Sequence, residues 1–175
     1  IVDVLRTQEG GTPKIYTPRL LGFPLRDTEN HILMTEGSRY LKNRWKALHG
    51  NSDPKYDNVA NGLEAWLVAY LEGMARAGVH EYNSRPYIGY TLTALLNLEA
   101  FTGEPVRVAA RRVLDRANWE YAVGSLSLRR FSPFRRQARR SVDTDLDGDY
   151  HTGVMKAWMG LAGVDDLYIR KGEHQ

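Results

Sequence analysis

Two short clusters of polar residues in the sequence contain side chains suited to proton transfer. The first is Glu29-Asn30-His31, where an amide that can donate hydrogen bonds precedes an imidazole that titrates near neutral pH. The second supplies a carboxylate, phenols, an amide, a hydroxyl and a guanidinium: Glu81-Tyr82-Asn83-Ser84-Arg85-Pro86-Tyr87. These groups could bind an anionic substrate and move protons on it. The plainer alternative is that the first cluster caps a helix and that the second is a hydrogen-bonded loop whose tyrosines pack against helices.

Helical periodicity indicates which elements position the two clusters. Asp27-Thr28 offers N-cap side chains, and a helix is predicted from Glu29 to about Leu48. A second helix stops at Gly78, a third ends near Gly103, and a fourth opens at Pro105. The apolar stripes of these four helices are Leu33, Leu41, Trp45 and Leu48; Leu63, Trp66, Leu67, Tyr70, Leu71 and Met74; Ile88, Leu92, Leu95 and Leu96; and Val106, Ala109, Val113, Ala117 and Tyr121.

Both polar clusters come at the start of a predicted helix. The N-terminal end of a helix presents free backbone N–H groups and a partial positive charge, which favour a nearby anion. In a stack of two helical hairpins, the first and third helices are neighbours and run parallel, so their N-terminal ends lie together. We therefore expect Glu29-Asn30-His31 and the 81–87 cluster to face one another across a shared site.

The whole chain, residues 1–175, is expected to form a single helical domain with an all-α fold of stacked antiparallel hairpins. Residues 1–27 read as an irregular lead-in, residues 124–150 as an arginine-rich and then aspartate-rich connection, and residues 152–161 as a last short helix. No segment has the pattern of a strand, and no apolar run reaches the roughly 20 residues of a membrane-spanning helix. Because the chain begins at Ile1 without a methionine or a leader, we expect the domain to be incomplete. The remainder of a longer chain, or another subunit, would then be a partner.

The order of the two clusters, one hairpin apart, resembles the α/α-toroid proteins related to alginate lyase and heparinase II/III-type polysaccharide lyases. The resemblance covers roughly residues 27–125 and rests on short motifs. It implies that the hairpins are part of an (α/α) toroid and that the protein is secreted by a bacterium, to an extracellular or periplasmic location. It also implies an acidic, uronate-containing polysaccharide as substrate, β-elimination as the reaction, and no required cofactor.

Carried over to this sequence, the resemblance implies a role for each cluster. Asn30 would neutralise the uronate carboxyl group, and His31 would act as a base or stabilise the developing anion. Tyr82 or Tyr87 would act as acid or base toward the leaving oxygen, and the spacing does not choose between them. Arg85 would pair with a substrate carboxylate. Further residues expected to bind substrate are Glu29, Glu81, Asn83 and Tyr87, together with Arg135 and Arg136 of the arginine-rich segment outside the resemblance.

Glu29 and Glu81 also support a different reaction. Paired carboxylates carry out glycoside hydrolysis, and their separation in space decides which mechanism they can follow. The sequence does not supply that separation. Hydrolysis by Glu29 and Glu81 therefore stays an alternative to elimination.

The connection after the fourth helix carries two further charge patterns. Arginines interleave with phenylalanines from Leu128 to Ser141, which suits a non-catalytic module that binds a polyanion or a partner. A salt-bridged face is the plainer interpretation, and no nucleic-acid fold signature accompanies the arginines, so nucleic acid is not an expected partner. Asp143, Asp145 and Asp147 alternate like the start of a calcium loop. Val154 stands where an EF-hand needs a glutamate, so a solvated turn is the plainer interpretation and Ca²⁺ the alternative.

Overall fold

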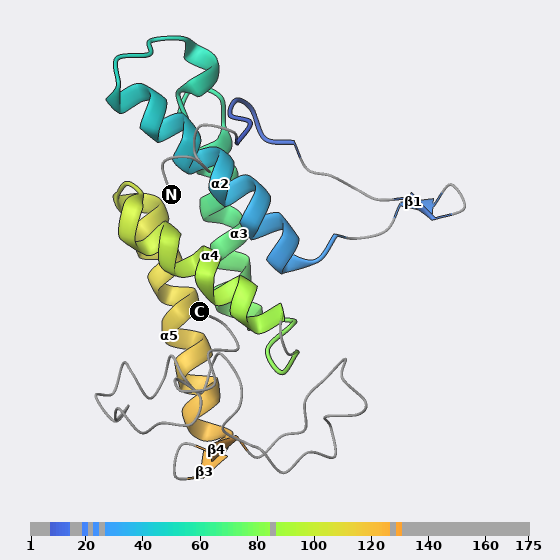
Figure 1. Cartoon of the computed structure of the whole chain (residues 1–175). Coiled ribbons are helices and arrows are strands. Elements are labelled where there is room, and N and C mark those ends of the chain that lie inside the picture. Colours follow the sequence, from blue (N-terminus) through green and yellow to red (C-terminus); the bar gives the residue numbers. More distant parts are fainter. Residues whose placement is uncertain are drawn as a thin grey trace, which may run out of the picture.

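The computed structural model describes residues 8–14, 19–20, 23–24, 27–84, 87–126 and 129–130. Within these ranges the chain is helical, which confirms the predicted all-α class (Figure 1). The helices are α2 (Glu29–Leu48), α3 (Leu63–Ala77), α4 (Tyr87–Phe101) and α5 (Glu104–Val123), with the 3-10 turn η1 (Pro54–Tyr56) between α2 and α3. The predicted helix over residues 152–161 lies outside the described residues.

The local sequence explains where the helices begin and end. α3 stops at Gly78, whose φ of 83° glycine adopts without steric cost, and Pro105 lies in the first turn of α5. Thr28 is the N-cap residue of α2, but its side chain makes no capping hydrogen bond, so this part of the prediction is wrong. The Asp27 carboxylate instead accepts a hydrogen bond from the backbone N–H of Thr28 at 2.8 Å.

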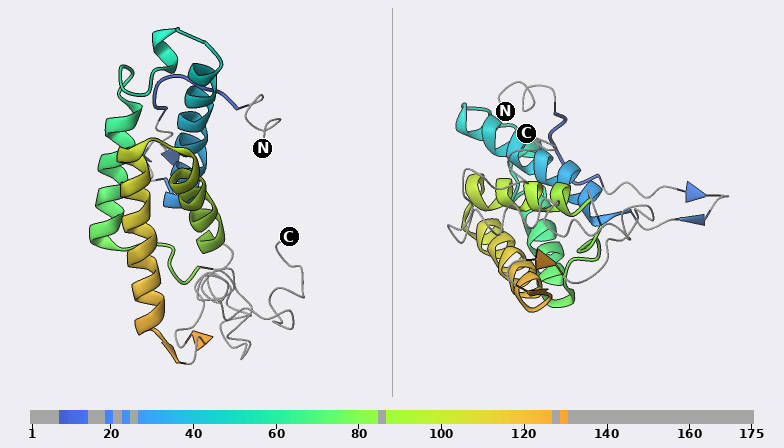
Figure 2. Two further views of the ribbon diagram at one scale, coloured as in Figure 1. Left: turned by 90° about the vertical axis from the view of Figure 1, so that its left-hand side faces the viewer. Right: turned by 60° about the horizontal axis from the view of Figure 1, so that its bottom comes forward.

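The main helix contacts are α2 with α4, α4 with α5, and α3 with α5 (Figures 1 and 2). The consecutive helices α2 and α3 touch one another less extensively. Leucines from all four helices fill the interior, and each buried leucine contributes about 1.5–3 kcal/mol relative to an exposed one. The fully buried leucines are Leu33, Leu63, Leu67, Leu71, Leu95 and Leu98, with Leu92 and Leu114 nearly so.

α2 and α4 are neighbours that start at the same end of the bundle, at the lower right of Figure 1. α5 follows α4 after Thr102-Gly103 and runs back along it. This is the relative placement that the sequence predicts for the first and third helices. It brings the N-terminal ends of α2 and α4 together.

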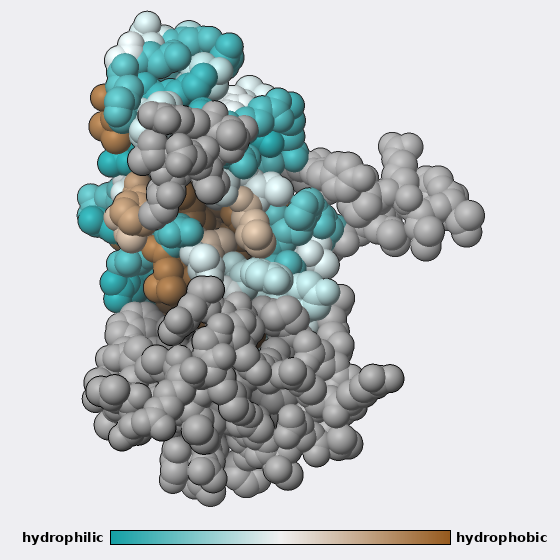
Figure 3. Space-filling view, in the orientation of Figure 1, coloured by the Kyte–Doolittle hydropathy of each residue, from teal (hydrophilic) through white to brown (hydrophobic). Residues whose placement is uncertain are grey.

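The predicted apolar stripes are mostly buried, with Leu48 and Leu96 exposed. Half-buried members are Leu41, Trp45, Trp66 and Tyr70. Leu96 is 36% exposed, whereas its neighbour Leu95 is fully buried, so the stripe of α4 continues through Leu95 and Leu98. Leu48 is the last residue of α2 and is exposed, because the chain turns away from the core after it. Figure 3 shows apolar surface in the region of α4. Met34 and Tyr90 are among the residues that line a groove between α2 and α4.

Two short antiparallel ladders depart from the expectation that the chain has no strands. β1 (Arg19–Leu20) pairs with β2 (Phe23–Pro24), and β3 (Ser125–Leu126) pairs with β4 (Arg129–Arg130). Each ladder has two residues per strand, which is too short a pattern to be recognised in a sequence. Among the described residues, no helix is long and apolar enough to cross a membrane.

Candidate functional site

Glu29 joins the start of α2 to the loop that leads into α4. Its Oε1 accepts a hydrogen bond from the backbone N–H of Glu81 at 2.6 Å, and its Oε2 accepts one from the N–H of His80 at 2.9 Å. The side chain is buried, and this burial raises the pKa of Glu29 more than the two N–H groups lower it. Both oxygens of the Glu29 carboxylate therefore bind the loop before α4, and these hydrogen bonds hold the two polar clusters next to one another.

His31 lies on the exposed side of this junction and is oriented by a carboxylate. Its Nδ1 is 2.6 Å from Oδ2 of Asp27, four positions earlier. The Asp27 side chain is 13% exposed and the His31 side chain 48% exposed, so the pair lies at the edge of the core. In the tautomer in which Nδ1–H donates a hydrogen bond to the carboxylate, the basic lone pair of the imidazole is on Nε2.

Asn30 and Ser84 carry buried polar atoms without a hydrogen-bond partner among the described residues. These atoms are Oδ1 of Asn30 and Oγ of Ser84. An unpaired buried polar atom costs free energy, so such atoms are rare and need an explanation. Because Asn30 follows Glu29 and Ser84 follows Glu81 by three positions, both unpaired atoms belong to the junction.

The other members of the second cluster are more enclosed than a solvated loop would be. Glu81 is 3% exposed, and Tyr82 is half-buried and packs against the hydrophobic core. Asn83 is half-buried. Tyr87 lies at the start of α4, where its ring meets that of Tyr90 edge-on at 6.2 Å.

A pocket of about 630 Å³ opens at the same end of the bundle. It lies between the start of α2 and the end of α3, and the loop before α4 closes one side. Asp27, Glu29, Tyr70, His80 and Glu81 are among the residues that line it. The junction therefore has an adjoining cavity large enough for a sugar unit.

Several predicted site residues cannot be placed. Arg85, Arg135, Arg136, Asp143, Asp145 and Asp147 lie outside the described residues. Within the described ranges, no group of histidines and carboxylates has the arrangement of a metal site.

A polar stripe on α2, which was not predicted, holds the 8–14 segment. Glu36, Arg39 and Asn43 are all buried. The Glu36 carboxylate accepts a hydrogen bond from the Lys14 N–H at 3.2 Å and pairs with Arg39 at 3.0 Å. Asn43 accepts from the N–H of Gly11 at 2.7 Å. The signal in the sequence is the spacing of three polar residues by three and four positions, which places them on one face of a helix.

Comparison of the chain with protein-family models, with curated proteins and with solved structures finds no match. The site is therefore interpreted from its own geometry.

Proposed function

We propose that this protein acts on an acidic, uronate-containing polysaccharide by β-elimination, with Asn30, His31 and Tyr82 as the catalytic residues. The observation that carries the proposal is the Asp27–His31 pair at the start of α2. A carboxylate on one ring nitrogen fixes the orientation and the tautomer of an imidazole, and this prepares the other nitrogen to act as a base.

The reaction assigns one step to each of these residues. His31 removes the proton from the carbon next to the uronate carboxyl group. The electron pair left behind forms a carbon–carbon double bond as the adjacent glycosidic carbon–oxygen bond breaks, and Tyr82 gives its proton to the leaving oxygen. Neutralisation of the carboxyl group by Asn30 makes the first step easier, because negative charge develops beside that group.

Neutralisation of the carboxyl group would use the Nδ2 amide of Asn30, which is the hydrogen-bond donor. The buried Oδ1 of Asn30 is an acceptor without a partner among the described residues, which suits a hydroxyl group of a substrate. A bound substrate would supply the missing partner and so remove the cost of the unpaired atom. We choose Tyr82 over Tyr87 because Tyr82 directly follows Glu81, whose backbone N–H is held by Glu29. Tyr87 lies beyond that anchored point, at the start of α4.

The helix arrangement supports the proposal at the level of the fold. In an (α/α) toroid, alternate helices run parallel and form two layers. α2 packs along α4 and α3 packs along α5, and this alternation is compatible with one part of a toroid. The same proposal includes three further points. The hairpins are stacked, the toroid is completed by residues or subunits beyond the described ones, and the protein is exported from a bacterial cell.

Hydrolysis by Glu29 and Glu81 receives less support from the geometry. A raised pKa suits a general acid, and the pKa of Glu29 is raised by burial. Both oxygens of Glu29 are occupied by backbone N–H groups, however, and Glu81 is nearly inaccessible. Both residues line the pocket beside the junction, but the Glu29 oxygens already accept hydrogen bonds and Glu81 is buried, so neither carboxylate is free to act as the acid or base of hydrolysis.

The proposal is tested by incubating the protein with alginate, polygalacturonate and glycosaminoglycans. Elimination creates an unsaturated product whose ultraviolet absorbance can be followed directly. New reducing ends without this absorbance would identify hydrolysis instead. Binding without either signal would favour a non-catalytic polyanion-binding module.

A further inference from the structure

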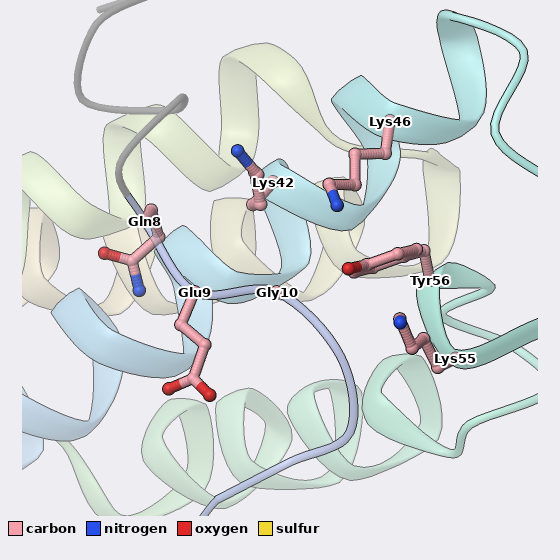
Figure 4. Close-up of a pocket in the computed structure, with 7 residues that line it drawn as sticks. All are labelled: Gln8, Glu9, Gly10, Lys42, Lys46, Lys55 and Tyr56. Atoms are coloured by element: carbon pink, nitrogen blue, oxygen red, sulfur yellow. The ribbon is translucent and has the colours of Figure 1, made fainter. Parts of the chain in front are cut away.

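A second pocket, of about 410 Å³, lies where the 8–14 segment crosses α2 close to η1 (Figure 4). Lys42 and Lys46 from α2 line it, together with Lys55 and Tyr56 from η1. Nζ of Lys46 is 3.7 Å from the centre of the Tyr56 ring, and Nζ of Lys55 is 4.8 Å from it. Figure 4 shows the Lys46 and Lys55 amines on either side of the phenol. The pocket therefore concentrates positive charge around one hydroxyl group.

Two carboxylates lie near this pocket, and each pairs with a lysine. Lys55 pairs with Asp53 at 2.9 Å on the protein surface. Glu9 is the acidic residue among those lining the pocket, but it pairs with Lys14, and Figure 4 shows its carboxylate pointing away from the three amines. Like charges held close together favour a multivalent anion between them.

The wall of the pocket is fixed in place by buried hydrogen bonds. Arg39 donates to the carbonyl oxygen of Gly10 at 3.2 Å, and Asn43 donates to that of Gly11 at 2.9 Å. A Cβ atom on Gly10 would lie 2.6 Å from Oδ1 of Asn43, so the segment approaches α2 as closely as a backbone can. Lys42 is only 5% exposed. The backbone wall and Lys42 are therefore in place before a ligand binds, whereas the Lys55 side chain is 56% exposed and is ordered by the ligand.

We propose that this pocket binds a tetrahedral oxyanion, either free phosphate or sulfate or the same group carried as an ester on a sugar. The cations lining this pocket are all lysines, which act as compact point charges without the planar geometry of arginine. The charge of the anion therefore decides its affinity, and phosphate and sulfate carry more charge than a single carboxylate. The Tyr56 hydroxyl provides a further donor. The pKa of Tyr56 lies below its usual value, chiefly because Lys46 donates a hydrogen bond to it, which agrees with a positive local field.

This site is independent of the proposed elimination chemistry. Lys42 follows His31 by three turns of α2, or about 16 Å along the helix axis. Neither Asp27 nor any residue of the two polar clusters lines the pocket. A failure of one proposal would therefore leave the other standing.

The binding test uses isothermal titration calorimetry of the full chain at constant ionic strength. The ligands are inorganic phosphate, inorganic sulfate, a hexose phosphate and glucuronate. We expect saturable binding of the tetrahedral anions and weaker binding of the planar carboxylate. A tighter complex with the hexose phosphate than with inorganic phosphate identifies an ester as the ligand, and equal affinity identifies the free ion.

Variants locate the binding in this pocket. We expect Lys46→Gln and Lys55→Gln each to weaken phosphate binding about tenfold, as the loss of one charge-assisted contact does. Arg107→Gln removes an exposed cation from α5 and should leave the affinity unchanged. Amide NMR signals of Gly10 and Tyr56 should shift on titration. No saturable binding, equal affinity in the lysine variants, or glucuronate bound as tightly as phosphate would each overturn the proposal.

Discussion

Oε1 of Glu29 lies 2.6 Å from the backbone nitrogen of Glu81, although the two residues are 52 positions apart in the sequence. This hydrogen bond, with its companion to His80, connects the first turn of α2 to the loop that precedes α4. Because this carboxylate accepts hydrogen bonds from two backbone N–H groups, it fixes the loop against α2. The arrangement of the candidate site therefore depends on a residue that does not itself face the solvent.

We expect Glu29→Ala to lower the free energy of unfolding by about 1–3 kcal/mol, because two buried N–H groups lose their acceptor. Glu104→Ala is a matched control, since Glu104 is also the first residue of a 20-residue helix but is exposed. Its replacement removes only the interaction with the helix dipole, about 0.3–1 kcal/mol. Urea denaturation measures both changes. Equal losses in the two variants would show that the Glu29 hydrogen bonds contribute nothing.

The raised pKa of Glu29 predicts how its contribution depends on pH. Burial lifts this pKa above the ordinary value of 4.5, so the folded protein binds the proton more tightly than the unfolded chain. The contribution is then fully present below the unfolded pKa and is lost as the pH rises through the folded pKa. The stability of the wild type relative to Glu29→Gln should therefore fall as the pH rises above the ordinary value of 4.5. A difference that rises over this range would mean that the N–H groups outweigh burial.

Gly10 and Gly73 should respond to alanine in opposite directions. A Cβ on Gly10 would meet Oδ1 of Asn43 at 2.6 Å, so Gly10→Ala should destabilise the protein by about 1–3 kcal/mol. A Cβ on Gly73, within α3, would meet nothing within 4 Å, so Gly73→Ala should stabilise it by about 0.5–1 kcal/mol. Thermal unfolding measures the change in melting temperature of both variants. A neutral Gly10→Ala would show that the 8–14 segment does not lie tightly against α2.

The neighbouring leucines of α4 provide a test of the core. Leu95 is fully buried, and we expect Leu95→Ala to cost about 2–5 kcal/mol. Leu96 is 36% exposed, and Leu96→Ala should change stability by no more than about 0.5 kcal/mol. Denaturant unfolding measures the free energy of unfolding of both variants. Similar costs at both positions would contradict the orientation of α4.

The helices could be predicted because their apolar residues repeat with a clear period. The start of α2 at Glu29 and the end of α3 near Gly78 follow from local signals that tertiary contacts do not change. The proximity of the two polar clusters could also be predicted, because the N-terminal ends of parallel neighbouring helices lie at the same end of the bundle.

What could not be predicted depends on contacts between distant residues. Glu36, Arg39 and Asn43 are polar, and nothing in the sequence places them in the interior. They are buried because the 8–14 backbone forms hydrogen bonds with them. In the same way, Glu29 was expected to bind substrate, and its hydrogen bonds to the backbone of residues 80 and 81 are visible only in the folded chain. A sequence shows which groups are present but not which backbone they will meet.

The most direct test of the proposed elimination compares two histidines of the same helix. His31 pairs with Asp27 at the start of α2, and His49 follows the end of α2 with its Nδ1 2.7 Å from the carbonyl oxygen of Trp45. On a uronate polysaccharide that the wild type cleaves, we expect His31→Ala to lower the rate of unsaturated product formation by about 100-fold or more. Tyr82→Phe should lower it similarly, and His49→Ala should leave it unchanged, with all three variants folded by circular dichroism. An unchanged rate in His31→Ala, or no ultraviolet signal from the wild type on any uronate polysaccharide, would contradict the account.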